Sequence, residues 1–333
     1  MRKKVGGIMA YVLTNRLVVG VASSALFDLS ESDAIFRAEG EEPYRTYQDA
    51  NIDTQLLPGV AFPFIQRLLG LNDLSPIGDP LVEVIVLSKN DPTTGLRVMR
   101  SIESHGLSIT RAVFTQGKSP YEYIGAFEMS LFLSADERDV RKAVELGFPA
   151  GRVMPSDLSY AEDGGEVRVA FDFDGVLADD ESERIFQGPG GLKGFQDHEV
   201  FNLDRSLSAG PLRELLKDLH MIQNLEKIKK LEQPQYQPRV RISIVTARNA
   251  PAHERAVRTL SAWGITVNDA FFLGGISKGS VLKVLRPHIF FDDQEGHLTA
   301  TAEFVASVHV PYGIANESPQ GTAISLDILE TVA

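Results

Sequence analysis

The sequence contains no cysteine, which excludes disulfide bonds, thiolate metal sites and a cysteine nucleophile. Positive charge is also scarce, because 33 basic residues stand against 45 acidic ones, for a formal net charge of −12. No basic stripe offsets this balance, so we expect neither a nucleic acid polymer nor an anionic membrane as a partner. No apolar run is long enough to span a bilayer. The expected compartment is therefore the cytoplasm.

The length and composition bound the domain organisation. A chain of 333 residues, 43% of them hydrophobic, is long enough for two domains with sizeable cores. We expect residues 1–15 to form a leader, either disordered or adding a strand. A cleaved secretion signal is disfavoured because Asn15 and Arg16 interrupt the apolar run. The remaining chain is expected to divide into domains over 16–150 and 151–333.

Short β-prone runs alternate with helical patterns throughout the chain, which is typical of an α/β protein with a parallel sheet. Strands are expected over residues 17–21, 82–87, 112–114, 131–133, 167–171, 242–245, 271–273 and 289–291. Helices are expected over residues 62–69, 92–105 and 250–263. Apolar residues at helical spacing over 211–231 predict one or two further helices that pack on the core.

The two halves of the chain repeat the same order of elements. Aligned at offsets of 150 and 158 residues, they match Val19 with Val169, Ser32 with Ser182, Arg97 with Arg255, Arg100 with Arg258 and Phe132 with Phe290. Identity is low, but the matches keep strand and helix register. We therefore predict an internal duplication that produced two tandem, Rossmann-like parallel-sheet units.

Polar side chains follow the expected strands of the second half. They are Asp172, Asp174, Thr246, Lys278, Asp292 and Asp293. Because the carboxyl ends of parallel strands meet at one edge of a sheet, we expect these side chains to lie together. Crowded carboxylates repel one another unless a cation lies among them, and ligands that are all oxygen favour Mg²⁺. At the equivalent positions the first half has Ala22, Ser24, Ser134 and Ala135, so it lacks these carboxylates.

An aspartate nucleophile beside an acid/base partner, with a lysine and a hydroxyl to bind phosphoryl oxygens, indicates phosphoryl transfer. Each feature also has a plainer interpretation when taken alone. Asp-x-Asp-Gly is found in turns and calcium loops, Thr246 suits a helix cap, and Lys278 suits a solvated surface. Their joint occurrence at several strand ends favours the phosphoryl-transfer site.

The motifs resemble the haloacid dehalogenase (HAD) superfamily of phosphatases and, within it, the cytosolic type I 5′-nucleotidase family. The likeness lies in Asp-Phe-Asp-Gly-Val at 172–176, Ile-Val-Thr-Ala-Arg-Asn at 244–249, Phe-Leu-Gly-Gly-Ile-Ser-Lys-Gly at 272–279, Phe-Asp-Asp-Gln at 291–294 and His-Val-Pro-Tyr-Gly at 309–313. It implies an α/β fold of two tandem HAD-like units. The first, over 16–150, is degenerate. The second, over 151–333, is catalytic and carries a small helical lid inserted at about 187–239.

The resemblance also implies a role for each site residue. Asp172 would attack the phosphorus, and Asp174 would protonate the leaving oxygen and then activate water. Thr246 and Lys278 would hold the phosphoryl oxygens. The implied Mg²⁺ ligands are Asp172, the backbone carbonyl of Asp174, Asp292 and Asp293. Arg248 and Asn249, just beyond Thr246, are candidates for contact with the substrate.

The function that the resemblance implies is a Mg²⁺-dependent 5′-nucleotidase that hydrolyses nucleoside 5′-monophosphates to nucleoside and phosphate. Two alternatives stay open. The first is a HAD-type phosphatase of other small phosphate esters, such as sugar phosphates. The second is a non-catalytic nucleotide-binding regulator. The expected partner is a small nucleoside monophosphate, and the degenerate first half leaves room for a homo-oligomer.

Overall fold

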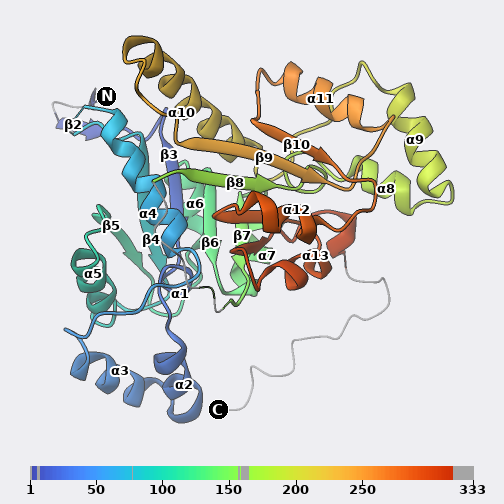
Figure 1. Cartoon of the computed structure of the whole chain (residues 1–333). Helices are drawn as coiled ribbons and strands as arrows, with labels where there is room; N and C mark the ends of the chain where they lie inside the picture. Colours follow the sequence, from blue (N-terminus) through green and yellow to red (C-terminus); the bar gives the residue numbers. More distant parts are fainter. Residues whose placement is uncertain (1, 6–7, 77, 157, 159–164, 318–333) are drawn as a thin grey trace.

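A computed structural model of the chain describes residues 2–5, 8–76, 78–156, 158 and 165–317 (Figure 1). Within the segment expected as a leader, β1 (Arg2–Val5) and β2 (Ile8–Tyr11) form an antiparallel ribbon. The hydroxyl of Tyr11, at the end of this ribbon, donates to Glu83 over 2.7 Å.

Ten strands of the described chain form one sheet, in the order β10-β9-β8-β11-β12-β7-β6-β3-β4-β5. Neighbouring strands are parallel, except at the centre, where β7 and β12 pair antiparallel. Their bounds are β3 Leu17–Val21, β4 Val82–Ser88, β5 Arg111–Phe114, β6 Leu131–Ser134, β7 Ala150–Val153, β8 Val167–Phe171, β9 Val240–Thr246, β10 Asp269–Phe272, β11 Ile289–Asp292 and β12 Ser307–His309. This mostly parallel sheet confirms the predicted α/β class.

The two halves of the sheet have the same strand order. In the first half β3 lies between β4 and β6, with β5 and β7 outside them. In the second half β8 lies between β9 and β11, with β10 and β12 outside them. The halves meet where Arg152 of β7 lies opposite His309 of β12. Each parallel strand thus has a counterpart at the same place in the other half.

Alternation along the strands explains why both faces of the sheet are covered. In β8, Val167, Val169 and Phe171 face one hydrophobic core, and Ala170 faces another. Successive strand residues point to opposite faces, so a strand that is apolar throughout must be buried on both. One core extends along one face of both halves, whereas the other face has a separate core in each half.

Helices cover both faces of the sheet. The core shared by the halves includes residues of α4 (Phe62–Gly70), α5 (Gly95–Ser104), α10 (Arg213–Glu232) and α11 (His253–Ala262). The other face is covered by α6 (Tyr123–Ala126), α7 (Glu137–Glu145), α12 (Lys278–Leu285) and α13 (Glu295–Thr301). The remaining elements are α1 (Ser23–Leu26), α2 (Ser30–Glu39), α3 (Glu41–Ala50), α8 (Glu181–Gln187), α9 (Gly191–Phe201) and three short 3₁₀ turns at Leu71–Leu74, Pro120–Glu122 and Ile314–Asn316.

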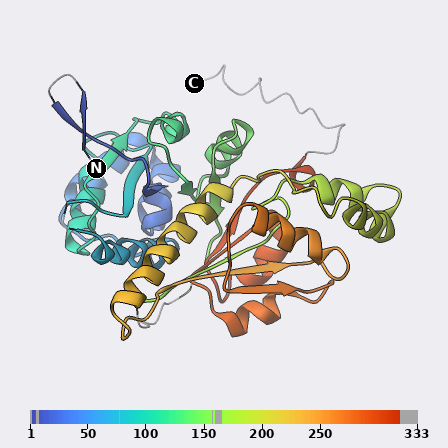
Figure 2. The ribbon, with the colours of Figure 1, turned by 90° about the horizontal axis from the view of Figure 1, so that it is seen from above.

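The segment 187–239, expected to be a lid, contains two helices with different surroundings. Helix α9 lies at the outer end of the second half beside α8 (Figure 1). Helix α10 instead lies along the junction of the two halves (Figure 2) and buries Leu215, Leu216 and Leu219 in the shared core. The predicted packing role of its apolar stripe is therefore confirmed for the first part of the helix, whereas Leu225 and Ile228 are exposed.

Two predicted helices begin later than expected. Helix α5 starts at Gly95 because Asp91 accepts hydrogen bonds from the backbone of Thr93 and Thr94, which folds residues 91–94 into a turn. Helix α11 starts at His253, after a turn over residues 250–252. Both helices still end within two residues of the predicted glycine stop.

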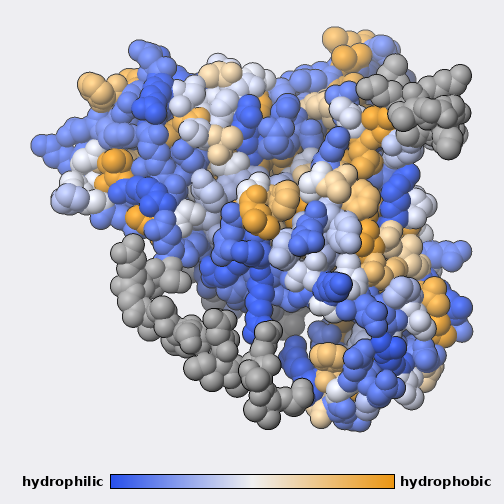
Figure 3. Space-filling model, turned by 180° about the vertical axis from the view of Figure 1, so that it is seen from behind, coloured by the Kyte–Doolittle hydropathy of each residue, from blue (hydrophilic) through white to orange (hydrophobic). Residues whose placement is uncertain are grey.

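Hydrophilic side chains cover most of the face opposite to the view of Figure 1, as Figure 3 shows. Among the helices that the structure describes, none is both long and apolar enough to cross a membrane.

Candidate functional site

The strand ends of the second half surround a cavity of about 340 Å³. Its lining includes the predicted site residues Asp172, Asp174, Thr246, Arg248, Asn249, Lys278 and Asp293. Helices α8 and α9 add an apolar wall formed by Phe186, Leu192 and Phe195. Asp292 is fully buried and contacts the site through Lys278. The structure therefore brings the predicted residues together, and their chemical roles stay predictions.

Lys278 connects two of the carboxylates. Its Nζ lies 2.6 Å from Oδ2 of Asp172 and 2.7 Å from Oδ2 of Asp292, and all three side chains are buried. Burial alone would lower the pKa of Lys278, but attraction to the two carboxylates raises it, so the ammonium stays charged. Burial, together with repulsion from Asp292, raises the pKa of Asp172 despite the nearby lysine.

Three carboxylates form a cluster that suits a cation. One oxygen each of Asp172, Asp292 and Asp293 lies within 4.8 Å of the others. Oδ1 of Asp293 is buried and has no hydrogen-bond partner among the described residues. Burial and the charges of Asp172 and Asp292 raise the pKa of Asp293. A hard divalent ion would relieve this repulsion and satisfy the free oxygen, so the donor set fits Mg²⁺.

Gly175 permits the close approach of the loop after Asp172 to the side chain of Asp293. Its φ is +72°, in the left-handed region, and a Cβ there would lie 2.6 Å from Oδ2 of Asp293. Glycine therefore meets both requirements, because it tolerates this φ and leaves room for the carboxylate.

The side chain of Asp174 lies outside the carboxylate cluster and pairs with Arg248. Nε of Arg248 donates to Oδ2 of Asp174 over 2.7 Å, and Nη2 donates to Oδ1 over 2.6 Å. The guanidinium carbon lies 5.3 Å from the ring centre of Phe173 and 5.5 Å from that of Phe195. Arg248 is 3% exposed, and its attraction to Asp174 and Glu199 outweighs burial and raises its pKa.

Glu199 of α9 is a functional candidate that the sequence reasoning missed. It is fully buried and accepts hydrogen bonds from Arg248, Arg255 and Ser182. Burial would raise the pKa of Glu199, but the two guanidinium groups hold it below its usual value. The repeat alignment contained Ser182 and Arg255, but no local pattern marked Glu199.

Two further residues complete the polar surroundings. His297 of α13, also missed from the sequence, lines the cavity and places Nδ1 3.2 Å from Oδ2 of Asp292. Thr246, at the end of β9, accepts a hydrogen bond from the backbone N–H of Arg248 over 3.2 Å. This contact fixes the Thr246 hydroxyl at the cavity wall and shapes the turn that follows it.

Comparison with known proteins identifies the family. A family model described as 5′-nucleotidase matches residues 9–317. The chain belongs to the 5′-nucleotidase family. Human cytosolic 5′-nucleotidase 1B is 34% identical to it over 293 residues, which are 85% of this chain and 47% of that protein. The chain thus spans about half the length of this curated relative. The family resemblance predicted from the motifs is confirmed.

Proposed function

We propose that this chain is a Mg²⁺-dependent phosphoric monoester hydrolase that converts nucleoside 5′-monophosphates to nucleoside and phosphate. The observation that carries the proposal is the buried contact of Asp172 with Lys278 inside a cluster of three carboxylates. A nucleophile, a phosphate-binding cation and a metal site then lie within one cavity. Membership of the 5′-nucleotidase family and the name of the human relative support the substrate class.

In the proposed first step, a carboxylate oxygen of Asp172 attacks the phosphorus of the substrate. The bond from phosphorus to the 5′ oxygen breaks, and its electron pair stays on that oxygen. Asp174, which lines the same cavity, donates a proton to this oxygen, so the nucleoside leaves with a hydroxyl group. The phosphoryl group is then held as an aspartyl phosphate on Asp172.

In the proposed second step, Asp174 accepts a proton from water as the water oxygen attacks the phosphorus. The bond from phosphorus to the Asp172 oxygen breaks, which restores the carboxylate and releases phosphate. Thr246 and Lys278, which both line the cavity, supply the donors for the phosphoryl oxygens.

Asp172, Asp292 and Asp293 would hold the Mg²⁺ ion, together with the backbone carbonyl of Asp174. The free Oδ1 of Asp293 supports this assignment, because a buried carboxylate oxygen otherwise lacks a partner. When bound, the ion neutralises negative charge on the carboxylates and on the phosphoryl group.

We infer that α8 and α9 form the lid. Phe186, Leu192 and Phe195 present apolar side chains to the cavity, and such a wall suits the nucleoside part of the substrate. Helix α10 packs on the sheet, so the inferred lid covers α8 and α9, residues 181–201, and not the whole segment 187–239.

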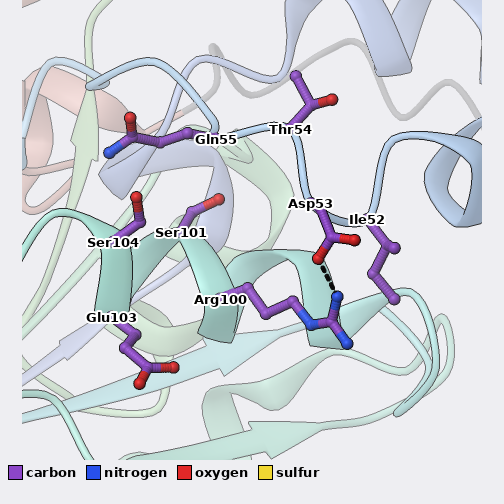
Figure 4. Close-up of a pocket in the computed structure, with 8 residues that line it drawn as sticks. All are labelled: Ile52, Asp53, Thr54, Gln55, Arg100, Ser101, Glu103 and Ser104. Atoms are coloured by element: carbon purple, nitrogen blue, oxygen red, sulfur yellow. Dashed lines mark hydrogen bonds and ion pairs between the residues drawn. The ribbon is translucent and has the colours of Figure 1, made fainter.

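We also infer that the two halves arose by duplication, with a degenerate first unit. Equivalent contacts recur in both halves, in addition to the shared strand order. The backbone N–H of Leu56 donates to Ser101, as that of Leu207 donates to Thr259. The Arg100–Asp53 ion pair, beside a first-half cavity of about 350 Å³ (Figure 4), corresponds to the Arg258–Asp204 pair. Descent of both halves from one ancestral unit explains such pairs more simply than chance.

Phosphate release from a panel of nucleoside monophosphates and sugar phosphates, with Mg²⁺ and with EDTA, tests the proposal. We expect Mg²⁺-dependent release from AMP, IMP or related nucleotides, and poor release from sugar phosphates. Release mainly from sugar phosphates would keep the chemistry and overturn the substrate. No release from any ester would favour the non-catalytic nucleotide-binding regulator.

A further inference from the structure

We propose that Glu199 and Arg248 form a buried relay that positions Asp174 from the lid helix α9. Arg248 is then a positioning residue and not a substrate contact. The inference rests on the proposed function, in which Asp174 donates the proton to the leaving oxygen.

The hydrogen bonds of Arg248 support this assignment. A guanidinium group has five N–H donors, and Arg248 meets five acceptors. They are both carboxylate oxygens of Asp174, the hydroxyl of Ser182, Oε2 of Glu199 and the carbonyl of Ala252. Each N–H group therefore has an acceptor within the protein, which leaves none for a phosphate or a base. Because all of its N–H groups are bonded, the planar guanidinium of Arg248 also fixes the orientation of the Asp174 carboxylate.

Glu199 connects the Arg248–Asp174 ion pair to the lid helix α9. It lies on α9, four residues beyond Phe195, whose ring faces both the cavity and the Arg248 guanidinium. Its second oxygen accepts from Nη1 of Arg255 on α11 over 2.9 Å. The position of α9 over the cavity is thus connected, through one buried carboxylate, to the orientation of Asp174.

Comparison with the first half of the chain shows which contacts of this arrangement only hold helices together. There Arg97 corresponds to Arg255, and its Nη1 donates to Oε1 of Gln48 over 3.1 Å. Nε of Arg97 donates to the carbonyl of Thr54 over 3.1 Å, as Nε of Arg255 donates to that of Arg205 over 2.9 Å. A neutral glutamine therefore makes the same link between helices that Glu199 makes in the second half.

The charged members of the relay occur only in the half that contains the carboxylate cluster. At the repeat offsets, Ser24 stands at the position of Asp174, and Asn90 stands at that of Arg248. In the first half the neutral Gln48 links α3 to α5, so this link between helices does not require a charge. Burying a charged glutamate at position 199 is costly unless it is paired, so we assign its charge to holding Arg248.

The test compares two leaving groups on the same nucleoside. One substrate is the nucleoside 5′-monophosphate that the panel shows to be turned over fastest. The other is its analogue with sulfur in place of the bridging 5′ oxygen. A thiol is far more acidic than an alcohol, with a pKa of about 8.5 for cysteine, so a thiolate leaves without a proton from Asp174. A misplaced Asp174 therefore slows the first step, release of the leaving group, selectively for the oxygen ester.

Because Asp174 also activates water in the second step, which both esters share, the rate compared is release of the nucleoside or thionucleoside in a single turnover. We expect Arg248→Lys and Glu199→Gln to lower this rate for the oxygen ester by about 10- to 100-fold, a part of the gain that general acid catalysis provides. For the sulfur ester we expect a loss of less than about 3-fold, and little change in KM for either ester. Arg97→Lys is the matched control in the first half, and we expect it to leave the ratio of the two rates unchanged.

Equal losses of the single-turnover release rate on both esters, or an effect confined to KM, would overturn the relay while leaving the proposed function intact. Phosphate release from neither ester by the unaltered chain would overturn the proposed function, and the relay with it. If Arg248→Lys lacks a cooperative unfolding transition, Glu199→Gln decides. The Gln48–Arg97 contact shows that glutamine satisfies the buried arginine at this place in the fold.

Discussion

The ammonium group of Lys278 lies against the carboxylate of Asp172, with 2.6 Å between Nζ and Oδ2. Asp172 directly follows strand β8 and Lys278 begins helix α12, so only the assembled fold brings them together. One positive charge faces the three clustered carboxylates, which leaves an excess of negative charge in a buried place. This imbalance is one reason for proposing that a cation binds at this edge of the sheet.

Replacing Lys278 should damage both stability and activity. In Lys278→Met the side-chain volume is nearly kept, but Asp172 and Asp292 lose their positive partner. Breaking a buried pair costs about 3–5 kcal/mol, and losing a phosphate donor costs about 100- to 1,000-fold in kcat. Denaturant unfolding and phosphate release measure the two effects. Lys283→Met, on the exposed side of the same helix, should change stability by less than about 0.5 kcal/mol.

Mg²⁺ should stabilise the folded chain. A ligand at 100 times its dissociation constant adds about 2.7 kcal/mol, so we expect excess Mg²⁺ to raise the melting temperature by several degrees relative to EDTA. Asp292→Asn should abolish this shift, because it removes one of the three clustered carboxylates. Asp136→Asn, at the corresponding edge of the first half, should retain it. A shift of equal size in all three proteins would contradict a metal site at Asp292.

Replacing Gly175 with alanine should disrupt the site by forcing the backbone of this loop away from Asp293. Its Cβ would lie 2.6 Å from Oδ2 of Asp293, and the left-handed φ adds about 1–2 kcal/mol of strain. We expect Gly175→Ala to lose most activity and to weaken the Mg²⁺-dependent rise in melting temperature. Gly296→Ala, where a Cβ meets no atom within 4 Å, is the control and should be neutral. Full activity in Gly175→Ala would show that the loop has room to move.

Asp218 should make stability depend on pH. Burial raises its pKa to about 6, from the ordinary value of 3.8, although Ser130 donates a hydrogen bond to it. The folded chain therefore holds this proton more tightly than the unfolded chain. Its contribution to stability is fully present below about pH 4 and is lost as the pH rises towards 6.

Asparagine at position 218 removes this titration and still accepts the hydrogen bond from Ser130. The stability of Asp218→Asn relative to the unaltered chain should increase by about 1–3 kcal/mol between about pH 4 and pH 7. Urea unfolding across this range measures the change. Asp204→Asn, which removes a 94% exposed carboxylate, controls for the loss of one negative charge. A pH-independent difference for Asp218→Asn would contradict the assignment.

Features that depend on local pattern could be predicted from the sequence. Apolar runs such as 167–171 are buried on both faces, so they show as strands, and the polar residues after them had to meet at one edge. The short strands β7 and β12, which join the two halves of the sheet, were not predicted. Pro149 and Gly151 interrupt the β pattern of β7, and β12 has only three residues. Their pairing is a tertiary contact between the two halves.

The role of Glu199 could not be predicted, for the same physical reason. It lies on a helix rich in polar residues, where a glutamate is usually solvated. Only the fold brings Arg248 from a loop and Arg255 from α11 to its two oxygens. The sequence likewise suggested an acid/base role for Asp174 but gave no sign that Arg248 binds both of its carboxylate oxygens.

Rapid acid quenching tests most directly whether Asp172 carries the phosphoryl group. Nucleoside monophosphate labelled in the phosphate is mixed with the unaltered chain and with Asp172→Asn, and each mixture is quenched during a single turnover. We predict acid-stable label on the unaltered protein that hydroxylamine removes, as it does from an acyl phosphate, and none on Asp172→Asn. Phosphate release by Asp172→Asn at the rate of the unaltered chain, or equal labelling of both proteins, would contradict the account.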